Sequence, residues 1–162
     1  MKSFFDTAEV LKTLGVLVNG SPFEIRILSP TRKSGWVPST FNGYFNDPLL
    51  VEPEVSKLKI TGAFGFFVTM NPIHEACLAR GYNTFIQGKT GTGVHDKDIV
   101  ERKWLLIDCD PTRNPKDISA TDSEKDLAKQ KCREIYAFLK SQGWPDPVVA
   151  DSGNGFHQNY RV

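Results

Sequence analysis

Residues 104–111 read WLLIDCDP, a continuous apolar run that ends in two carboxylates and a proline. The run Trp104–Ile107 predicts a strand covered on both faces, and Pro111 lacks the N–H needed to continue a sheet ladder. Residues i and i+2 of a strand point to the same side, so Asp108 and Asp110 can reach one site. Two close carboxylates repel each other, and a divalent cation bound between them relieves that repulsion. Carboxylate oxygens are hard ligands, which suit Mg²⁺ or Mn²⁺. The alternative is that the strand simply reaches solvent, where Asp before Pro often starts a turn.

The sequence after this run predicts one long helix and a β-hairpin. Thr121 to Glu124 form a capping box, the helix runs to about Gln142, and Gly143 stops it. Its expected core stripe consists of Leu127, Ala128, Ile135, Phe138 and Leu139. Strands are expected at 147–150 and 156–162, joined by the tight turn 151–155.

The hairpin turn carries the second group of candidate residues, within the segment 152–157, SGNGFH. Its two glycines allow a tight turn with exposed N–H groups, a concave surface suited to phosphate oxygens. Ser152 and His157 can add side-chain donors to the same anion. The alternative is an ordinary hairpin with Asn154-Gly155 as its turn and His157 as an incidental strand residue.

The first hundred residues show a coarser pattern. Helices are expected at 6–14, with Asp6 and Glu9 as a capping box, and at 48–57. We expect a half-buried strand at 23–27, a buried strand with core phenylalanines at 63–70, and irregular turn-rich chain at 29–46 and 81–98. Strands and helices intermix, so the class is α+β or α/β, and we expect the former, with a mixed or antiparallel sheet and flanking helices.

The amino-acid composition limits the classes of protein to which the chain can belong. The 162 residues are 40% apolar and 24% charged, which fits one soluble domain and excludes a disordered chain. No apolar run is long enough to cross a bilayer, and a charge comes too early for a secretory signal. Three scattered cysteines point to a reducing compartment, so we expect a cytoplasmic protein without membrane partners. The formal charge of +1 gives no global field for nucleic acid, although local pairs such as Arg32-Lys33 and Arg102-Lys103 can meet phosphates.

The two motifs together resemble the archaeo-eukaryotic primase superfamily, specifically the bifunctional DNA primase/polymerase domains of phages, plasmids and mobile elements. Residues 104–113 look like that family's strand ending in Asp-x-Asp, and residues 150–157 look like its small-x-His motif. Further similarity to this branch lies at 118–124 and 143–147, and more weakly at 43–47 and 67–72. The resemblance therefore covers most of the chain, and its specific part is 104–160.

The resemblance implies template-dependent nucleotidyl transfer by two metal ions, Mg²⁺ or Mn²⁺, held by Asp108 and Asp110. It implies a single-stranded DNA template, dNTP or NTP substrates, and a helicase domain or another replication protein as partner. His157 would be an electrostatic clamp on the triphosphate, and Arg113 matches a basic position just after the acidic motif, where it would help to bind phosphates. The implied nucleotide-binding residues are Ser152, Gly153, Asn154, Gly155, His157 and Arg113.

The superfamily has a third acidic motif on a strand after the histidine, which we expect beyond residue 162. The chain is then a single domain, residues 1–162, forming the N-terminal portion of a primase–polymerase catalytic core. Asp151, Asp96 or Asp98 could stand in as a ligand, but their spacing does not favour it. One alternative is a non-catalytic nucleotide- or nucleic-acid-binding relative, and another is a metal-dependent nuclease, which needs no triphosphate-gripping turn.

One further motif is rejected. Gly88-Lys89-Thr90 invites assignment as a P-loop, but position 83 is Asn where the first glycine should stand, and no helical pattern follows.

Overall fold

A computed structural model describes residues 6–31, 36, 39–89, 91–113, 115 and 118–162. The chain divides into two compact units, unit 1 (Met1–Arg102) and unit 2 (Lys103–Val162). The basic pair Arg32-Lys33 and the opening five residues lie outside the described residues. The elements are α1 (Thr7–Leu17), β1 (Phe23–Leu28), β2 (Thr40–Phe45), η1 (Pro48–Leu50), α2 (Val51–Lys57), β3 (Gly65–Val68), η2 (Glu75–Arg80), β4 (Thr84–Gln87), η3 (Asp96–Asp98), β5 (Trp104–Cys109), α3 (Asp122–Ser141), β6 (Val148–Asp151) and β7 (Phe156–Arg161).

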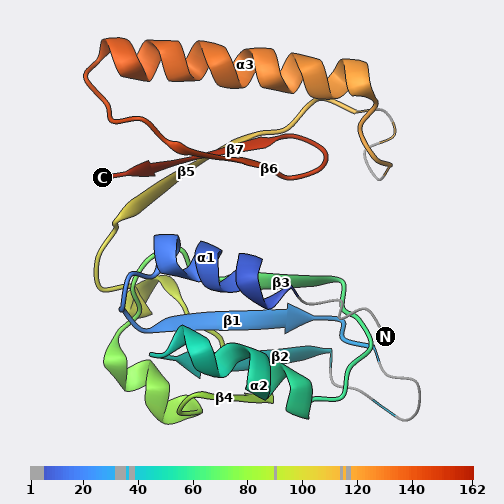
Figure 1. Ribbon diagram of the computed structural model, residues 1–162, viewed down its shortest axis with the longest axis vertical. Helices are drawn as coiled ribbons and strands as arrows, with labels where there is room; N and C mark the ends of the chain where they lie inside the picture. Colours follow the sequence, from blue (N-terminus) through green and yellow to red (C-terminus); the bar gives the residue numbers. More distant parts are fainter. Residues whose placement is uncertain (1–5, 32–35, 37–38, 90, 114, 116–117) are drawn as a thin grey trace. The chain divides into compact units, whose positions relative to one another are not determined.

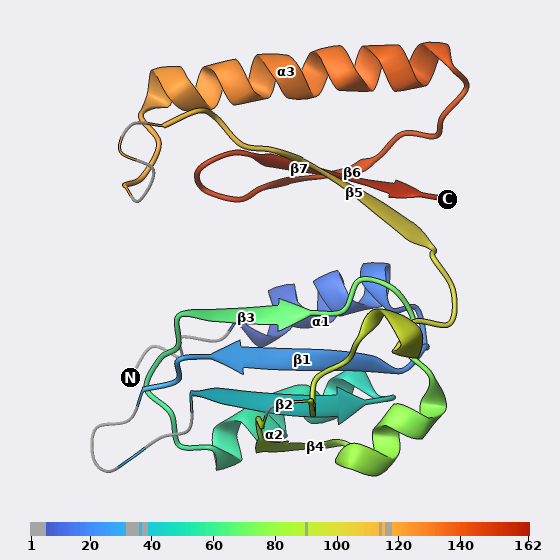
Figure 2. The same ribbon diagram turned by 180° about the vertical axis from the view of Figure 1, so that it is seen from behind.

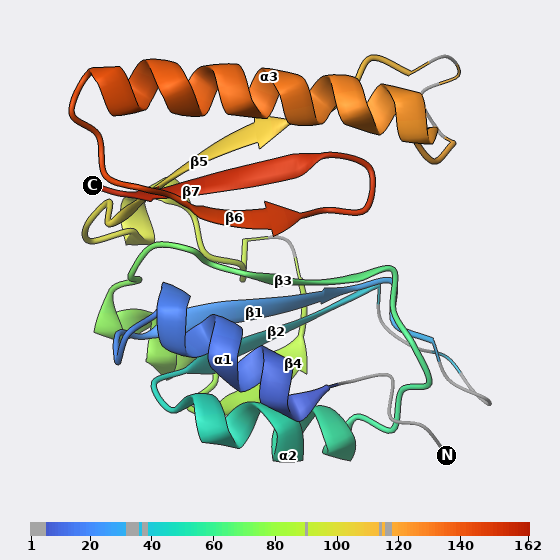
Figure 3. The same cartoon turned by 45° about the horizontal axis from the view of Figure 1, so that its top comes forward.

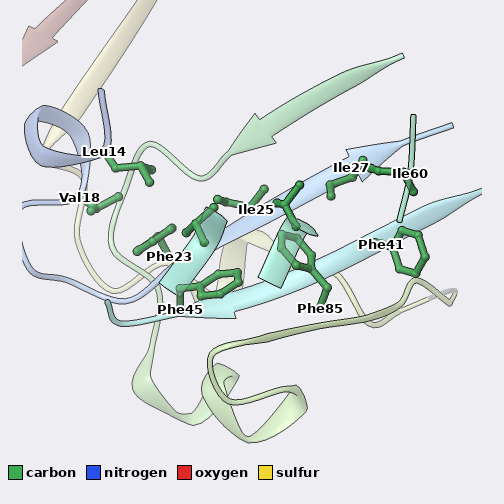
Figure 4. Packing of buried hydrophobic residues seen from close by; sticks show 11 residues of the cluster. Leu14, Val18, Phe23, Ile25, Ile27, Phe41, Phe45, Ile60 and Phe85 are labelled. Atoms are coloured by element: carbon green, nitrogen blue, oxygen red, sulfur yellow. The ribbon is translucent and has the colours of Figure 1, made fainter. Parts of the chain in front are cut away.

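Unit 1 contains a four-stranded antiparallel sheet in the order β3-β1-β2-β4, which Figure 2 shows from one side. Alternate residues of its strands are large and apolar, so one face forms the core of this unit. Side chains of α1 and α2 pack on that face, and Figures 3 and 4 show the helices and the packing. The buried cluster comprises Leu14, Val18, Phe23, Ile25, Ile27, Phe41, Phe45, Val51, Val55, Ile60 and Phe85.

The predictions of irregular chain at 29–46 and 81–98 are wrong in part, because these stretches hold β2 and β4. β2 is a central strand whose register pairs Phe23 with Phe45 and Ile27 with Phe41. Its glycine is needed by packing, since a Cβ on Gly43 would lie 2.5 Å from the Phe45 ring. Glycine often indicates a turn in a sequence, but Gly43 lies inside the sheet, where the chain packs closely.

The strand predicted at 63–70 is correct in place and wrong in burial. β3 is an edge strand with a neighbour on one side only, and its burial pattern is mainly exposed. Phe64, which precedes it, is 81% exposed, and Phe66 and Phe67 are also exposed. The expected core phenylalanines of this stretch therefore lie at the surface of the sheet edge.

Unit 2 is a three-stranded antiparallel sheet, β5-β7-β6, with α3 along one face (Figure 3). The capping box is confirmed, since Thr121 and Glu124 exchange side-chain and backbone hydrogen bonds, and Gly143 follows the helix at φ +83°. Ala128 and Cys132 are the buried helix residues, and the Gln158 amide donates to the Cys132 carbonyl at 2.7 Å.

Two expectations for unit 2 are wrong. The core stripe of the helix is right at Ala128, which is buried, and wrong at Leu127 and Phe138, which are 66% and 64% exposed. The second buried helix residue is Cys132, which the predicted stripe did not include. Leu105 and Leu106 of β5 are also exposed, so the strand is not covered on both faces.

The fold is α+β with antiparallel sheets and helices. Among the described residues, no helix combines the length and the apolar character needed to span a membrane.

Candidate functional site

The β5–β7 register brings together the two motifs of unit 2. Asp108 pairs with His157 across the ladder, and the His157 Nε2 lies 3.4 Å from Asp108 Oδ1. Both side chains are partly exposed, so the contact is open to solvent. Residues separated by 49 positions in the chain therefore form one patch, where a carboxylate and an imidazole can contact the same ligand.

Asp110 joins this patch through its contact with Gly155. Gly155 is buried, and a Cβ on it would lie 2.7 Å from Asp110 Oδ1 and 2.4 Å from the Cys109 carbonyl oxygen. Both distances are shorter than real Cβ atoms allow, so a side chain here would displace the acidic segment. The two glycines of the turn therefore differ in role, because Gly153 adopts φ +90° whereas Gly155 permits a close approach.

The turn uses its own backbone donors. The Gly153 N–H donates to Asp151 Oδ1 at 2.8 Å, and the Gly155 N–H donates to the Ser152 hydroxyl oxygen at 2.9 Å. The Ser152 N–H in turn donates to the Gly155 carbonyl at 3.0 Å. A triphosphate could take up the N–H groups of Gly153 and Gly155 only if these bonds opened.

Arg113 and Asn154 hold the loop between β5 and α3. The Arg113 guanidinium donates to the Ile118 carbonyl at 2.8 Å, and Asn154 Oδ1 accepts from the Ala120 N–H at 3.0 Å. These bonds fix the loop next to the turn. The first bond engages one guanidinium nitrogen, and within the described part of the chain the other Arg113 donors have no hydrogen-bond acceptor.

Asp151 and Asp98, two candidates for a further metal ligand, each form an ion pair with another residue. Asp151 pairs with Lys125 at 2.8 Å, and this contact lowers the pKa of the Asp151 carboxyl. Asp98 belongs to unit 1, where Arg80 lies 2.9 Å from it. Neither supplies a spare ligand to Asp108 and Asp110.

The donor set can be tested against a divalent cation. Within the described ranges, His, Cys, Asp and Glu side chains form no group of three or more that could hold a metal ion. Mg²⁺ usually keeps several waters and is held by one or two carboxylates together with phosphate oxygens. The exposed carboxylates of Asp108 and Asp110 fit this mode of binding, in which the nucleotide itself completes the shell.

A pair of cysteines lies on the opposite face of β5, and sequence reasoning missed it. Cys109 and Cys132 are buried free thiols, the first on β5 and the second on α3. Burial, and then the neighbouring Cys132, raise the pKa of the Cys109 thiol to about 11. No local pattern indicates the pair, because it forms only when α3 packs on the sheet.

The raised pKa predicts a loss of stability in alkali. The unfolded chain loses the Cys109 proton near the ordinary pKa of 9.0, before the folded chain does at about 11. The stabilisation is therefore fully present below pH 9 and is lost as the pH rises from 9 towards 11. We expect wild type to lose about 1 kcal/mol more than Cys109→Ala between pH 8 and pH 10, measured by urea denaturation. Equal losses in the two proteins would contradict this assignment.

Comparisons of the chain with protein-family models, with curated proteins and with solved structures find no match.

Proposed function

We propose that the chain is part of a template-dependent nucleotidyltransferase, a DNA primase/polymerase of phage, plasmid or mobile-element replication. The observation that supports it best is the pairing of Asp108 with His157, with Asp110 beside Gly155. An acidic pair for a cation then lies next to a donor for phosphate, which is the combination that transfer from a nucleoside triphosphate requires. The template is single-stranded DNA, the substrates are dNTPs or NTPs, and a helicase domain or another replication protein is the expected partner.

Each residue has a distinct role in this proposal. Asp108 and Asp110 hold Mg²⁺ or Mn²⁺, which supplies neutralisation of the triphosphate charge when bound. His157 turns its Nε2 from Asp108 to a phosphate oxygen and acts as an electrostatic clamp, not as a nucleophile. Arg113 and the Ser152 hydroxyl add donors from the neighbouring loop and turn.

A second candidate is a non-catalytic relative that binds nucleotide or nucleic acid. Two observations favour it. Among the described residues, Asp108 and Asp110 are not joined by a third metal-binding side chain, and the N–H groups of Gly153 and Gly155 are already hydrogen-bonded within the turn. Incorporation of labelled nucleotide on a primed single-stranded template would decide for the transferase, because a non-catalytic relative does not extend the primer.

The clamp role is tested with His157→Ala. A hydrogen bond to a charged group contributes about 1.5–3 kcal/mol, so we expect dATP affinity in Mn²⁺ to fall roughly ten- to hundredfold. Affinity for dAMP should change less than about twofold, because the imidazole contacts the outer phosphates only. Calorimetric titration with Mn²⁺ and with EDTA measures both.

The matched control is His74→Ala, which removes an exposed imidazole that caps η2 in unit 1. It should leave both affinities unchanged. Equal losses of dATP and dAMP binding in His157→Ala would show that the imidazole does not clamp a triphosphate.

A further inference from the structure

The face of the unit 1 sheet opposite its apolar core carries a buried polar network. Glu24 of β1 is 2% exposed, and its carboxylate accepts from Arg26 Nη2 at 2.9 Å and from the Val94 N–H at 3.1 Å. The buried Asn42 amide of β2 donates to its other oxygen. A carboxylate this deeply buried is stable only because these donors satisfy it.

A polar groove of about 530 Å³ opens above this network. It lies between the polar sheet face and the described residues of the segment 88–95. Its lining includes Arg26, Asn42, Lys89, Gly91, Gly93 and His95. Most of the residues that line the groove have polar side chains or are glycines, which suits a charged ligand and not an apolar one.

Arg26 is held in place before any ligand arrives. Glu24 fixes one guanidinium nitrogen, and a Cβ on Gly93 would lie only 2.1 Å from that same atom, Nη2. A side chain at position 93 would therefore displace the guanidinium from this position. Arginine has five N–H donors, and its side chain is 38% exposed, so further donors face the groove.

The groove carries a surplus of positive charge. Arg26 offsets Glu24, whereas Lys89 is exposed and has no ion-pair partner among the residues that the structure describes. Gly91, at φ +81°, and Gly93 present backbone without side chains. A fixed guanidinium, an exposed ammonium and glycine backbone along the groove together suit phosphate recognition.

We propose that this groove binds a phosphate group, carried by a nucleic acid strand or by a free nucleotide. The groove is lined by residues of unit 1 alone, and the proposal stands whether or not the acidic patch of unit 2 binds nucleotide. It is also not a P-loop, because the phosphate lies on a sheet face and not at the N-terminus of a helix.

The first test follows backbone amides by NMR, in EDTA, during titration with inorganic phosphate, dAMP, and an oligonucleotide with and without a 5′-phosphate. We expect saturable shifts at Gly88, Gly91 and Gly93. Tighter binding of either oligonucleotide than of dAMP assigns the phosphate to a strand, and the reverse assigns it to a nucleotide. No saturable shift at these glycines with any probe would overturn the proposal.

Variants then identify the donors. Lys89→Gln should weaken binding of the preferred probe about threefold to tenfold, and Gly93→Ala should weaken it further by displacing the Arg26 guanidinium. Lys12→Gln, on α1 against the other face of the sheet, should leave binding unchanged. Equal weakening by Lys12→Gln and Lys89→Gln would reduce the effect to general charge and refute the site.

Discussion

Replacing Asp108 and Asp110 together with asparagine is expected to abolish Mn²⁺-dependent dATP binding while unit 2 stays folded. Even an outer partner of a metal ligand costs about 10–100-fold in affinity when removed, so losing both carboxylates should exceed roughly a hundredfold. Both side chains are exposed, so their loss should change the free energy of unfolding by about 0.5 kcal/mol or less. Calorimetry with and without Mn²⁺ measures the binding, and circular dichroism checks the fold.

The matched control is Asp126→Asn, which removes an exposed carboxylate from α3, on the opposite face of the same sheet. It should bind dATP as wild type does. If the double variant retained full Mn²⁺-dependent binding, the cation would lie elsewhere and the proposed transferase site would be wrong.

Unit 2 could be predicted closely because its signals are local. The capping box at Thr121, the stop at Gly143 and the hairpin turn each depend on residues within a few positions of one another. Hairpin length fixes the β6–β7 register. The β5–β7 register, which places His157 across from Asp108, is a pairing between distant residues, which local signals do not predict.

Unit 1 could not be predicted in the same way, because its strands are defined by distant partners. β2 is rich in residues that also form turns, and it becomes a strand through its pairing with β1 and β4. Alternation along β1 predicted a half-buried strand, but Glu24 is buried by donors that come from β2 and from residue 94.

Individual contacts within the candidate site also could not be predicted, because they depend on strand pairing between distant residues. Sequence predicted that Asp108 and Asp110 share a site, yet the close approach of Asp110 to Gly155 depends on the strand pairing. The bonds inside the turn from Gly153 and Gly155 likewise depend on where Asp151 and Ser152 point. Turn composition shows that N–H groups are available and does not show which acceptor takes them.

Glu24→Gln is expected to destabilise unit 1 by about 2–3 kcal/mol. The three partners of the carboxylate, Arg26, Asn42 and the Val94 N–H, are all hydrogen-bond donors. A glutamine amide would add an NH₂ group, a further donor, and these partners offer it no acceptor. One buried donor is then left unsatisfied, at a cost of about 1–3 kcal/mol, and the Arg26 charge loses its partner. The exposure of Arg26 keeps this second cost small. Urea denaturation followed by circular dichroism measures the loss.

The double variant Glu24→Gln, Arg26→Gln separates the two costs. If the charge of Arg26 matters, the double variant should lose less than the sum of the single losses, because neither charge is left alone. Glu9→Gln, an exposed carboxylate on α1, should change stability by less than about 0.5 kcal/mol. A Glu24→Gln loss as small as that of Glu9→Gln would mean that water satisfies the network, and that Arg26 is not fixed in the groove in advance.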